Sequence, residues 1–307
     1  MSHAPLIIVN PTAGGGRAAR LVPWLRERLE RRADADLRIT RGPGEAEEMA
    51  AGALASGHDR VVAVGGDGTV QEVVNGLLGA EEPAELGIVP VGTGNDLARS
   101  LALPTDAALG WRIAIGSTSQ PLDVLRARNG DGRERWFGSA GGIGFDAQVA
   151  AAMADRRGWQ AGRAGYLLTT LSELRRFENR PVRITIDGAV IDRAVLLVAI
   201  ANGEFYGGGM RIAPGARPDD GRADICVVGD ISRLTALRQL ANLYRGTHVH
   251  HPAVSMYSGS EIAIDGDAAT RIHLDGEPFG AIPLRVRVVP AALRVAAPAA
   301  TPAASRS

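Results

Sequence analysis

The chain has 307 residues, and its 34 acidic side chains balance its 34 basic ones. This balance argues against the strongly basic surface that non-specific nucleic-acid binding requires. All the basic residues in that count are arginines, so a lysine-containing P-loop, Schiff-base chemistry and a lysine general base are excluded. The single cysteine, Cys226, excludes an intramolecular disulfide and a cysteine-based zinc cluster, and favours a reducing compartment.

The apolar runs and the start of the chain favour a soluble, cytoplasmic protein. A strand-like run at residues 6–9 begins close to the N-terminus, and no signal-peptide pattern precedes it. The longest clean apolar run, residues 195–201, is far shorter than the ~20 residues that span a bilayer. The tail from Ala296, rich in alanine, proline and serine, is expected to be disordered.

Strands and helices are expected to alternate through the first third of the chain. Strand-like runs occupy residues 6–9, 37–40, 61–64 and 86–90, with helical patterns at 18–32, 45–55 and 70–78. This alternation predicts a parallel sheet with helices on its faces, and ligands of such sheets bind beyond the carboxyl ends of the strands. The glycine-rich segments 10–17, 65–69 and 92–96 all fall at those ends.

From about Asp123 the sequence changes to short β-rich runs, which are residues 182–187, 195–201, 223–228, 261–265, 271–274 and 284–289. Asp-Gly pairs at 187–188, 265–266 and 275–276 are typical of hairpin turns. Two helices interrupt the runs, one over about residues 163–177 and one from Ser232, its N-cap, to Tyr244. The pattern predicts a second, antiparallel β domain arranged as a sandwich.

The loop from Asn10 to Arg17 follows the first strand and contains three consecutive glycines. It could wrap around a nucleotide with Arg17 near a phosphate, or it could be an ordinary turn between a strand and a helix. The residues alone leave both interpretations open.

The segment Gly65-Gly66-Asp67-Gly68-Thr69 lies between an apolar strand and a helix. Three glycines at such a step expose backbone N–H groups that suit phosphate oxygens, whereas a plain tight turn needs fewer of them. A carboxylate in a phosphate-binding turn is repulsive unless a cation intervenes. Asp67 is therefore a candidate ligand of Mg²⁺, directly or through water.

A second glycine turn carries Thr93, Asn95 and Asp96 into a helix. Asn95 or Asp96 could be a simple N-cap. Because a hydroxyl, an amide and a carboxylate among glycines exceed what capping needs, we favour a binding site.

Two acidic turns of the second domain are further candidates. Asp219-Asp220-Gly221 is by default a turn, and alternatively a hard-cation site made by Asp220 and neighbouring carbonyls. Leu274-Asp275-Gly276-Glu277-Pro278 resembles the other hairpin turns, but it adds a second carboxylate, Glu277, followed by a proline.

The histidines do not favour a metal site. His248, His250 and His251 follow a helix without ligand spacing, which favours a solvated loop, and His273 is expected in a strand. Cys226, in a β-rich run, is expected in the core.

Together these segments resemble the diacylglycerol kinase catalytic family, which also contains sphingosine kinases and bacterial soluble lipid kinases. The resemblance covers nearly the whole chain and rests on Asn10-Pro11 and on residues 65–69, 90–96, 220–221 and 274–278. Residues 289–294 resemble the bacterial branch called YegS-like. Gly-Gly-Asp-Gly is shared with NAD kinases and phosphofructokinases, but the later segments separate this chain from them.

The resemblance implies a phosphofructokinase-like α/β domain for nucleotide over residues 1–122, with residues 291–297 as a candidate return to it. It implies a C-terminal antiparallel β-sandwich domain for the lipid substrate over residues 123–290, and residues 298–307 would be a disordered tail. ATP would bind in the cleft between the two domains.

The resemblance also implies roles by position. The nucleotide contacts would be Asn10, Thr40, Gly65, Gly66, Asp67, Gly68, Thr69, Thr93, Asn95 and Asp96. Asp67, Asp96 and Asp123 would organise the catalytic Mg²⁺, and a structural Mg²⁺ would be held by the Asp220 side chain and the carbonyls of Arg217 and Arg222. Glu277 matches the general base and, with Asp67, would be catalytic. Some relatives have a lysine near the nucleotide; here arginine or backbone must serve.

The sequence therefore predicts an ATP- and Mg²⁺-dependent lipid kinase, with diacylglycerol as the favoured acceptor and phosphatidic acid as its product. The alternatives are a kinase of a soluble acceptor such as NAD and a non-catalytic nucleotide- or lipid-binding protein. The expected partner is a membrane lipid, met by transient peripheral contact at the inner face of the membrane; no nucleic-acid partner is expected, and homodimerisation stays open.

Overall fold

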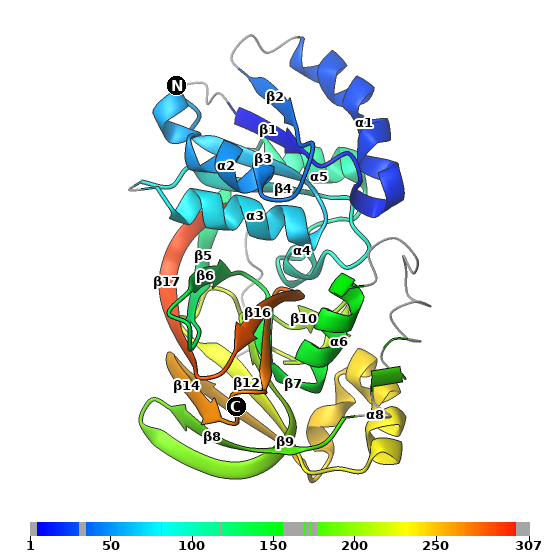
Figure 1. Ribbon diagram of the computed structural model, residues 1–307. Helices are drawn as coiled ribbons and strands as arrows, with labels where there is room; N and C mark the ends of the chain where they lie inside the picture. The colour runs from blue at the N-terminus through cyan, green and yellow to red at the C-terminus, as the bar shows by residue number, and fades with distance from the viewer. Residues whose placement is uncertain are drawn as a thin grey trace. The chain divides into compact units, whose positions relative to one another are not determined.

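The computed structural model describes residues 5–30, 35–80, 82–116, 118–155, 169, 172–173 and 177–298. The chain forms two compact units, whose elements are labelled in Figure 1. Unit 1 consists of Met1–Gly92, Leu101–Leu122 and Ala291–Ser307, and unit 2 of Thr93–Ser100 and Asp123–Pro290. The segment Thr93–Ser100, which the sequence placed in the first domain, thus groups with unit 2.

Unit 1 is built on a parallel sheet. Its strands lie in the order β2 (Asp36–Ile39), β1 (Pro5–Val9), β3 (Arg60–Gly65) and β4 (Glu85–Pro90). The end of β17 (Leu284–Ala296) adds a parallel pairing to β4, through Val295 and Leu86. Every residue of β1 and β3 is buried, as expected for parallel strands covered on both faces.

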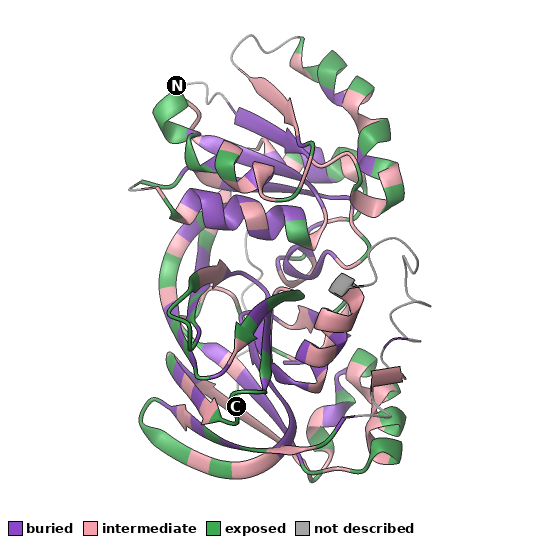
Figure 2. Cartoon of the chain, viewed as in Figure 1, coloured by how far each residue is buried: buried purple, intermediate pink, exposed green. Residues whose placement is uncertain are grey.

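Helices cover both faces of this sheet. The helices α1 (Ala13–Leu29) and α5 (Ala107–Ala114) share a core with the sheet, in which Trp24 and Trp111 meet edge to face. The helices α2 (Glu45–Ala51) and α3 (Asp67–Leu78) pack together, and Figure 2 shows α3 largely buried. A Cβ at Gly76 would lie 2.2 Å from the carbonyl oxygen of Glu47, so glycine is what lets these two helices approach.

The first helix agrees with the sequence prediction at its start. Helix α1 is assigned from Ala13, but Gly14, Gly15 and Gly16 have left-handed backbone angles, so its regular turns begin after Gly16, close to the predicted residue 18. Residues 31–34 lie outside the described part of the chain. The helix predicted over residues 45–55 ends at Ala51, because Gly52 leaves helical geometry and a short 3₁₀ turn, Leu54–Ser56, follows.

Unit 2 is an antiparallel sheet domain, which confirms the predicted class of fold. Its strands are β5 (Ser119–Arg128), β6 (Glu134–Phe137), β7 (Ala140–Gly144), β8 (Arg180–Ile186), β9 (Ala189–Ala201), β12 (Ala223–Gly229), β13 (Val254–Gly259), β14 (Glu261–Gly266), β15 (Arg271–Leu274), β16 (Glu277–Ala281) and the start of β17. The main order is β16-β15-β7-β9-β8-β14-β17, and β12 joins β9 to β13.

The long strand β9 takes part in two differently paired regions of the sheet. Its first half pairs with β8, whereas its second half pairs with β7 on one side and with β12 on the other. Side chains from strands of both parts, among them Phe137, Ile184, Val198, Ile225 and Leu284, therefore meet in one apolar core.

Two of the three predicted Asp-Gly hairpins are confirmed. Asp187-Gly188 and Asp275-Gly276 each join two strands with positive φ at both residues, as type I′ turns require. The prediction for 265–266 is wrong, because Asp265 and Gly266 lie inside β14 and pair with Arg183 and Val182.

The α-helices of unit 2 whose bounds fall within the described residues are α4 (Asp96–Ser100), α6 (Phe145–Asp155) and α8 (Arg233–Arg245). The N-cap prediction is confirmed, since the Ser232 side chain accepts a hydrogen bond from the Thr235 N–H. Most of the helix predicted over residues 163–177 lies outside the described residues. Among those described, no helix is both long and apolar enough to span a membrane.

Candidate functional site

Three loops of unit 1 meet at the carboxyl edge of the parallel sheet. They follow β1, β3 and β4, and the Gly65 carbonyl joins the last two by accepting hydrogen bonds from the Val91 and Gly92 N–H groups at 2.8 and 3.2 Å. The first loop starts beside β3, where the Asn10 N–H donates to the Val64 carbonyl at 3.1 Å. The structure thus brings together the glycine segments that lie far apart in the sequence.

Asn10 connects two of these loops through its side chain. Its Nδ2 donates to Oγ1 of Thr69 at 3.0 Å, and its Oδ1 accepts from the N–H and the hydroxyl of Thr12 at 3.1 and 2.8 Å. Thr40 lies nearby in the fold, because its N–H donates to the carbonyl of Val9 at 2.9 Å. The predicted nucleotide residues Asn10, Thr40 and Thr69 therefore occupy one edge of the sheet.

Packing explains some of the glycines in these loops. A Cβ at Gly65 would lie 2.4 Å from Thr69 Oγ1, and one at Gly14 would lie 2.1 Å from the Val91 carbonyl oxygen. Gly14, Gly15 and Gly16 also have positive φ, a conformation that other residues rarely adopt.

Gly68 has no such structural reason to be glycine. A Cβ there would meet nothing within 4 Å, its φ is ordinary, and it lies exposed in the first turn of α3. Glycine in a helix costs stability relative to alanine, so the absence of a side chain needs another explanation. Close approach of a ligand to bare backbone is one general reason for glycine at such a position.

The N-terminus of α3 suits an anion. The first N–H groups of a helix have no acceptor inside the helix, and no side chain caps this one at Gly66. The helix dipole adds partial positive charge at the same place. Asp67 occupies the first turn, where a carboxylate also interacts favourably with the dipole.

Arg17 supplies a full positive charge next to these loops. Its Nε donates to the Gly14 carbonyl at 3.1 Å and its Nη2 to the Gly92 carbonyl at 3.0 Å. The side chain is exposed and forms no ion pair with a described residue. In a chain without lysine, this guanidinium is the cation that the loop cluster of unit 1 presents.

In unit 2, Asp96 bonds to a second glycine turn. Its buried carboxylate accepts hydrogen bonds from the Gly208 and Gly209 N–H groups at 3.0 and 2.9 Å. These glycines, with Gly207, lie at positive φ between β10 (Phe205–Tyr206) and β11 (Met210–Arg211). Asp96 thus binds a remote segment, which a simple N-cap would not do.

The other two residues of this predicted turn are placed differently. Asn95 is buried and has a φ of 54°, an uncommon conformation for a residue other than glycine. Thr93 is exposed.

The structure connects two acidic segments that the sequence treated separately. Asp123 is buried, its Oδ2 accepts from the Gly221 N–H at 2.6 Å, and its N–H donates to the Pro218 carbonyl at 2.7 Å. Asp220 is exposed and accepts from the Arg222 N–H at 3.1 Å. Asp123 and the loop at 217–222 therefore form one structural element.

The two arginines of that loop point their guanidinium groups at other partners. Arg217 pairs with Asp219 at 3.0 Å, and Arg222 donates to Ser258. A guanidinium has no lone pair to offer a metal ion, so the backbone carbonyls are the groups of these arginines that could be metal ligands, as the sequence resemblance implies. Within the described residues, no group of three or more histidine, cysteine or acidic side chains is gathered as a metal ligand set, so the predicted Mg²⁺ ligands stay a prediction.

Asp275 is a positioning residue that the sequence analysis treated as part of a turn. Its carboxylate accepts hydrogen bonds from the N–H groups of Gly138, Ser139 and Ala140 at 2.9, 2.9 and 3.0 Å. These bonds fix the hairpin that presents Glu277, which is exposed and pairs across the turn with Leu274. No sequence signal distinguishes this aspartate from those of the other Asp-Gly turns.

Asn202 is a second residue that the sequence analysis missed. It is fully buried, and its Nδ2 donates to the carbonyls of Asp123 and Gly138 at 2.7 and 2.9 Å. It thereby joins the segment of Asp123 to the turn that Asp275 holds. The hint that the sequence offers is an asparagine directly after an apolar run.

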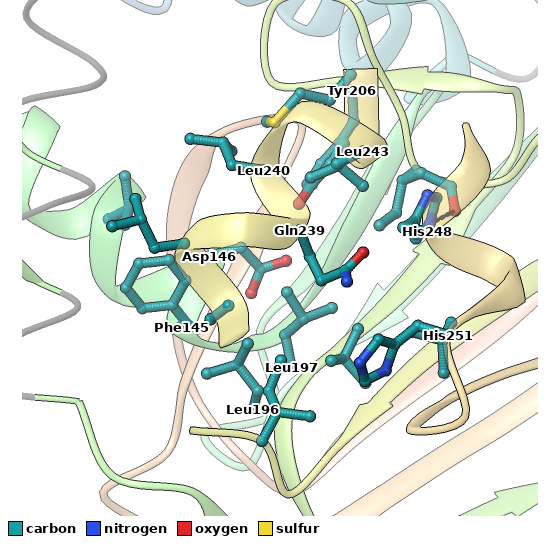
Figure 3. A pocket seen from close by; sticks show the side chains of 18 residues that line it. Phe145, Asp146, Leu196, Leu197, Tyr206, Gln239, Leu240, Leu243, His248 and His251 are labelled. Carbon is teal, nitrogen blue, oxygen red and sulfur yellow. Dashed lines mark hydrogen bonds between the residues drawn. The ribbon is translucent and has the colours of Figure 1, made fainter. Parts of the chain in front are cut away.

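An apolar pocket lies inside unit 2, between α6, α8 and the β9–β12 part of the sheet (Figure 3). Phe145, Leu196, Leu197, Leu240 and Leu243 are among the apolar side chains that line it and are labelled in Figure 3. A few polar side chains also line the pocket, namely Asp146, Gln239, His248 and His251. Apolar walls with a few polar groups are typical of sites for small hydrophobic ligands.

Two buried histidines lie at or near this pocket. Nε2 of His273 lies 3.0 Å from Oδ2 of Asp146, and both side chains are buried. The prediction of a solvated loop is wrong for His248, which is 3% exposed and lies 3.2 Å from the Ile212 carbonyl oxygen. Burial lowers the pKa of His248 and raises the pKa of its neighbour Cys226 to about 12.

Known proteins resemble the chain over nearly its whole length. The model of the diacylglycerol kinase catalytic domain matches residues 4–127, and that of the YegS C-terminal NAD kinase β-sandwich-like domain matches residues 140–297. A Mycobacterium tuberculosis (strain CDC 1551 / Oshkosh) protein named diacylglycerol kinase is 34% identical, over 95% of this chain and 94% of that protein. A Pseudomonas putida protein named probable lipid kinase YegS-like is 31% identical, over 87% and 86%.

Solved structures agree. A crystal structure of a diacylglycerol kinase from Bacillus anthracis str. Sterne superposes with a TM-score of 0.72 at 25% identity, covering 97% of both chains. The chain is therefore a lipid kinase, as the sequence predicted. It belongs to the diacylglycerol kinase family, in which its C-terminal half matches the YegS-like group.

Proposed function

We propose that this lipid kinase transfers the γ-phosphate of ATP to the free hydroxyl of diacylglycerol, giving phosphatidic acid. The observation that carries the nucleotide half of the proposal is the loop cluster of unit 1, where bare backbone at Gly68 faces open space in the first turn of a helix whose N-cap, Gly66, has no capping side chain. Phosphate oxygens are the ligands that such a surface accepts.

The residues of unit 1 have separate tasks in this proposal. Backbone N–H groups of Gly65, Gly66 and Gly68 bind the phosphates, and Asn10 and Thr69 fix the loop geometry through their mutual hydrogen bond. Thr40 and Arg17 complete this edge of the sheet. Phosphoryl transfer consists largely of positioning and charge stabilisation, which is what these groups provide.

The acidic residues fit a divalent metal in their donor chemistry. Asp67, Asp96 and Asp123 are hard oxygen donors, and backbone N–H bonds orient the carboxylates of Asp96 and Asp123. Mg²⁺, when bound by them, would neutralise negative charge on the phosphates. The Asp220 side chain with the carbonyls of Arg217 and Arg222 would hold a second, structural Mg²⁺.

Glu277 acts as the general base in this proposal. It takes the proton from the acceptor hydroxyl as that oxygen bonds to the γ-phosphorus. The bond between the γ-phosphorus and ADP breaks, and ADP is the leaving group. General base catalysis contributes about 10²–10⁴ in rate. Glu277→Gln should therefore leave nucleotide binding unchanged and lower turnover by that factor.

The apolar pocket of unit 2 supports the lipid half of the proposal. Its leucine and phenylalanine walls suit acyl chains, whereas a soluble acceptor such as NAD would need many more polar contacts. Thr93 and Asn95 are assigned to the nucleotide by the sequence resemblance alone.

Labelled ATP tests the proposal. The purified chain is incubated with [γ-³²P]ATP, MgCl₂ and either diacylglycerol in mixed micelles or NAD, and the products are separated. We expect the wild-type protein to put label into phosphatidic acid and the Glu277→Gln variant to put in almost none. Label in NADP, or nucleotide binding without labelling of any lipid, would refute it in favour of the other two functions that the sequence left open.

A further inference from the structure

The outward face of α8 is unusually apolar for a surface helix. Leu234, Leu237 and Tyr244 are 56%, 42% and 41% exposed. They are half of the large apolar side chains that are exposed in the described part of the chain; the others are Leu54, Leu109 and Val190, each on a different element. Exposed apolar side chains gathered on one helix mark an interaction site more strongly than scattered ones.

The opposite face of the same helix packs on the protein. Ala236, Leu240 and Leu243 lie against the apolar core of unit 2. Helix α8 nevertheless has no buried residue, and Figure 2 shows it mostly in the colours of exposed and intermediate residues. The inward side chains therefore hold α8 on unit 2, whereas Leu234 and Tyr244 belong neither to this core nor to the lining of the apolar pocket.

The outward face also carries positive charge. Arg238 and Arg245 lie four and eleven residues after Leu234, which places all three on one side of the helix. The helix contains three arginines and no acidic residue, in a chain whose net charge is zero. Neither Arg238 nor Arg245 forms an ion pair with a described residue, whereas Arg233 donates to the carbonyl of Phe177.

We propose that the outward face of α8 docks the protein on an anionic lipid bilayer. Leucine and tyrosine side chains would enter the interface while the arginines contact lipid phosphates, which is how interfacial helices bind. The inference rests on the proposed function in one respect, that the acceptor is a membrane lipid. It deepens that function because Leu237 also lines the apolar pocket, so docking would bring the bilayer to the pocket wall.

A second copy of this chain fits the same face less well. A two-fold interface built on α8 would bring together two copies of its arginine-bearing face, with no acidic residue of the helix to pair them. Three exposed apolar side chains are also few for a stable dimer. A bilayer needs neither self-complementary shape nor paired charges.

Vesicle co-sedimentation without nucleotide tests the docking. Wild-type protein is mixed with vesicles of phosphatidylcholine alone or with phosphatidylglycerol added. The double variant Leu234→Ser with Tyr244→Ser spares Leu237 and the pocket, and its control is Leu109→Ser, a leucine of unit 1 that is 49% exposed. We expect about tenfold weaker binding for the double variant and an unchanged value for the control.

The arginines have their own test and control. Arg238→Ala with Arg245→Ala should remove most of the preference for vesicles with phosphatidylglycerol, about fivefold per arginine. Arg287→Ala, at a side chain that is 74% exposed on β17, should keep the preference.

Unchanged vesicle binding in both α8 double variants, with folding verified by circular dichroism, would overturn the proposal. A change from dimer to monomer with vesicle binding unchanged would do the same, in favour of a self-association surface. Because no nucleotide or turnover is involved, failure here leaves the proposed kinase reaction standing, and failure of the kinase assay leaves this result interpretable.

Discussion

Gly68→Ala should stabilise the protein and weaken its binding of ATP. The new Cβ would meet nothing within 4 Å, and the φ of Gly68 is already one that alanine adopts. Replacing such a glycine restricts the unfolded chain and gains about 0.4–1 kcal/mol. Because the methyl group would cover the backbone of the first turn of α3, phosphate could no longer approach it, and we expect ATP affinity to fall at least tenfold.

Thermal unfolding and calorimetric titration with ATP measure the two effects. For 307 residues, the stability gain corresponds to a rise of about 0.6–1.6 °C in the unfolding midpoint. Gly52→Ala is the matched control, because its Cβ would also meet nothing within 4 Å and its φ of −92° is permitted, at the end of α2. It should leave ATP affinity unchanged. If the Gly68→Ala protein bound ATP as tightly as wild type, phosphate would not bind at the backbone of Gly68.

Three further predictions follow from the structure. Asp275→Ala should lower the free energy of unfolding in urea by about 3 kcal/mol, because three N–H groups lose a charged acceptor, and it should lower kcat while ATP affinity stays near wild type; full turnover in a folded variant would contradict the positioning role. Burial lowers the pKa of His248 below its ordinary 6.5, so the unfolded state binds the proton first and the free energy of unfolding should decline as the pH falls below about 6.5. In urea titrations at several pH values, His248→Gln should flatten that decline, and an unchanged pH dependence would contradict the prediction. Cys226, whose pKa burial raises to about 12, should not react with iodoacetamide at pH 8 until the protein unfolds, and rapid native labelling would show that its site is open.

Local pattern predicted the parts of the fold that depend on neighbouring residues. The buried run Val61–Val64 followed by glycines indicated a strand with a bare turn, and the structure has β3 leading into α3 at that place. Ser232 predicted the start of α8 because a cap acts within three residues. Asp187-Gly188 predicted a hairpin for the same reason.

Contacts between remote segments were beyond the sequence. Asp96 binds Gly208 and Gly209 more than a hundred residues away, so Thr93–Ser100 packs with unit 2 although it directly follows a strand of unit 1. His248 follows an exposed helix, and only the fold shows that the 3₁₀ turn after it returns the ring to the core. The prediction of an Asp265-Gly266 turn failed because its pairing with β8 decides the conformation there.

The candidate site divides in the same way. The glycine segments and the acidic motifs are visible as residue types, and the family comparison confirms the lipid kinase that they predicted. The segment of Asp123 and the hairpin that presents Glu277 are held by hydrogen bonds of Asn202 and Asp275, which look ordinary in the sequence. Such supporting residues become visible only when the donors around them are known.

In the function proposed above, main-chain N–H groups of the loops after β1 and β3 hold the triphosphate. Hydrogen–deuterium exchange of the whole chain, with and without MgATP, measures those groups directly. We expect the amide hydrogens of residues 13–16 and 65–69 to exchange more slowly when nucleotide is present. If saturating nucleotide protected another part of the chain and left both loops exchanging at their nucleotide-free rate, these loops would not be the triphosphate site.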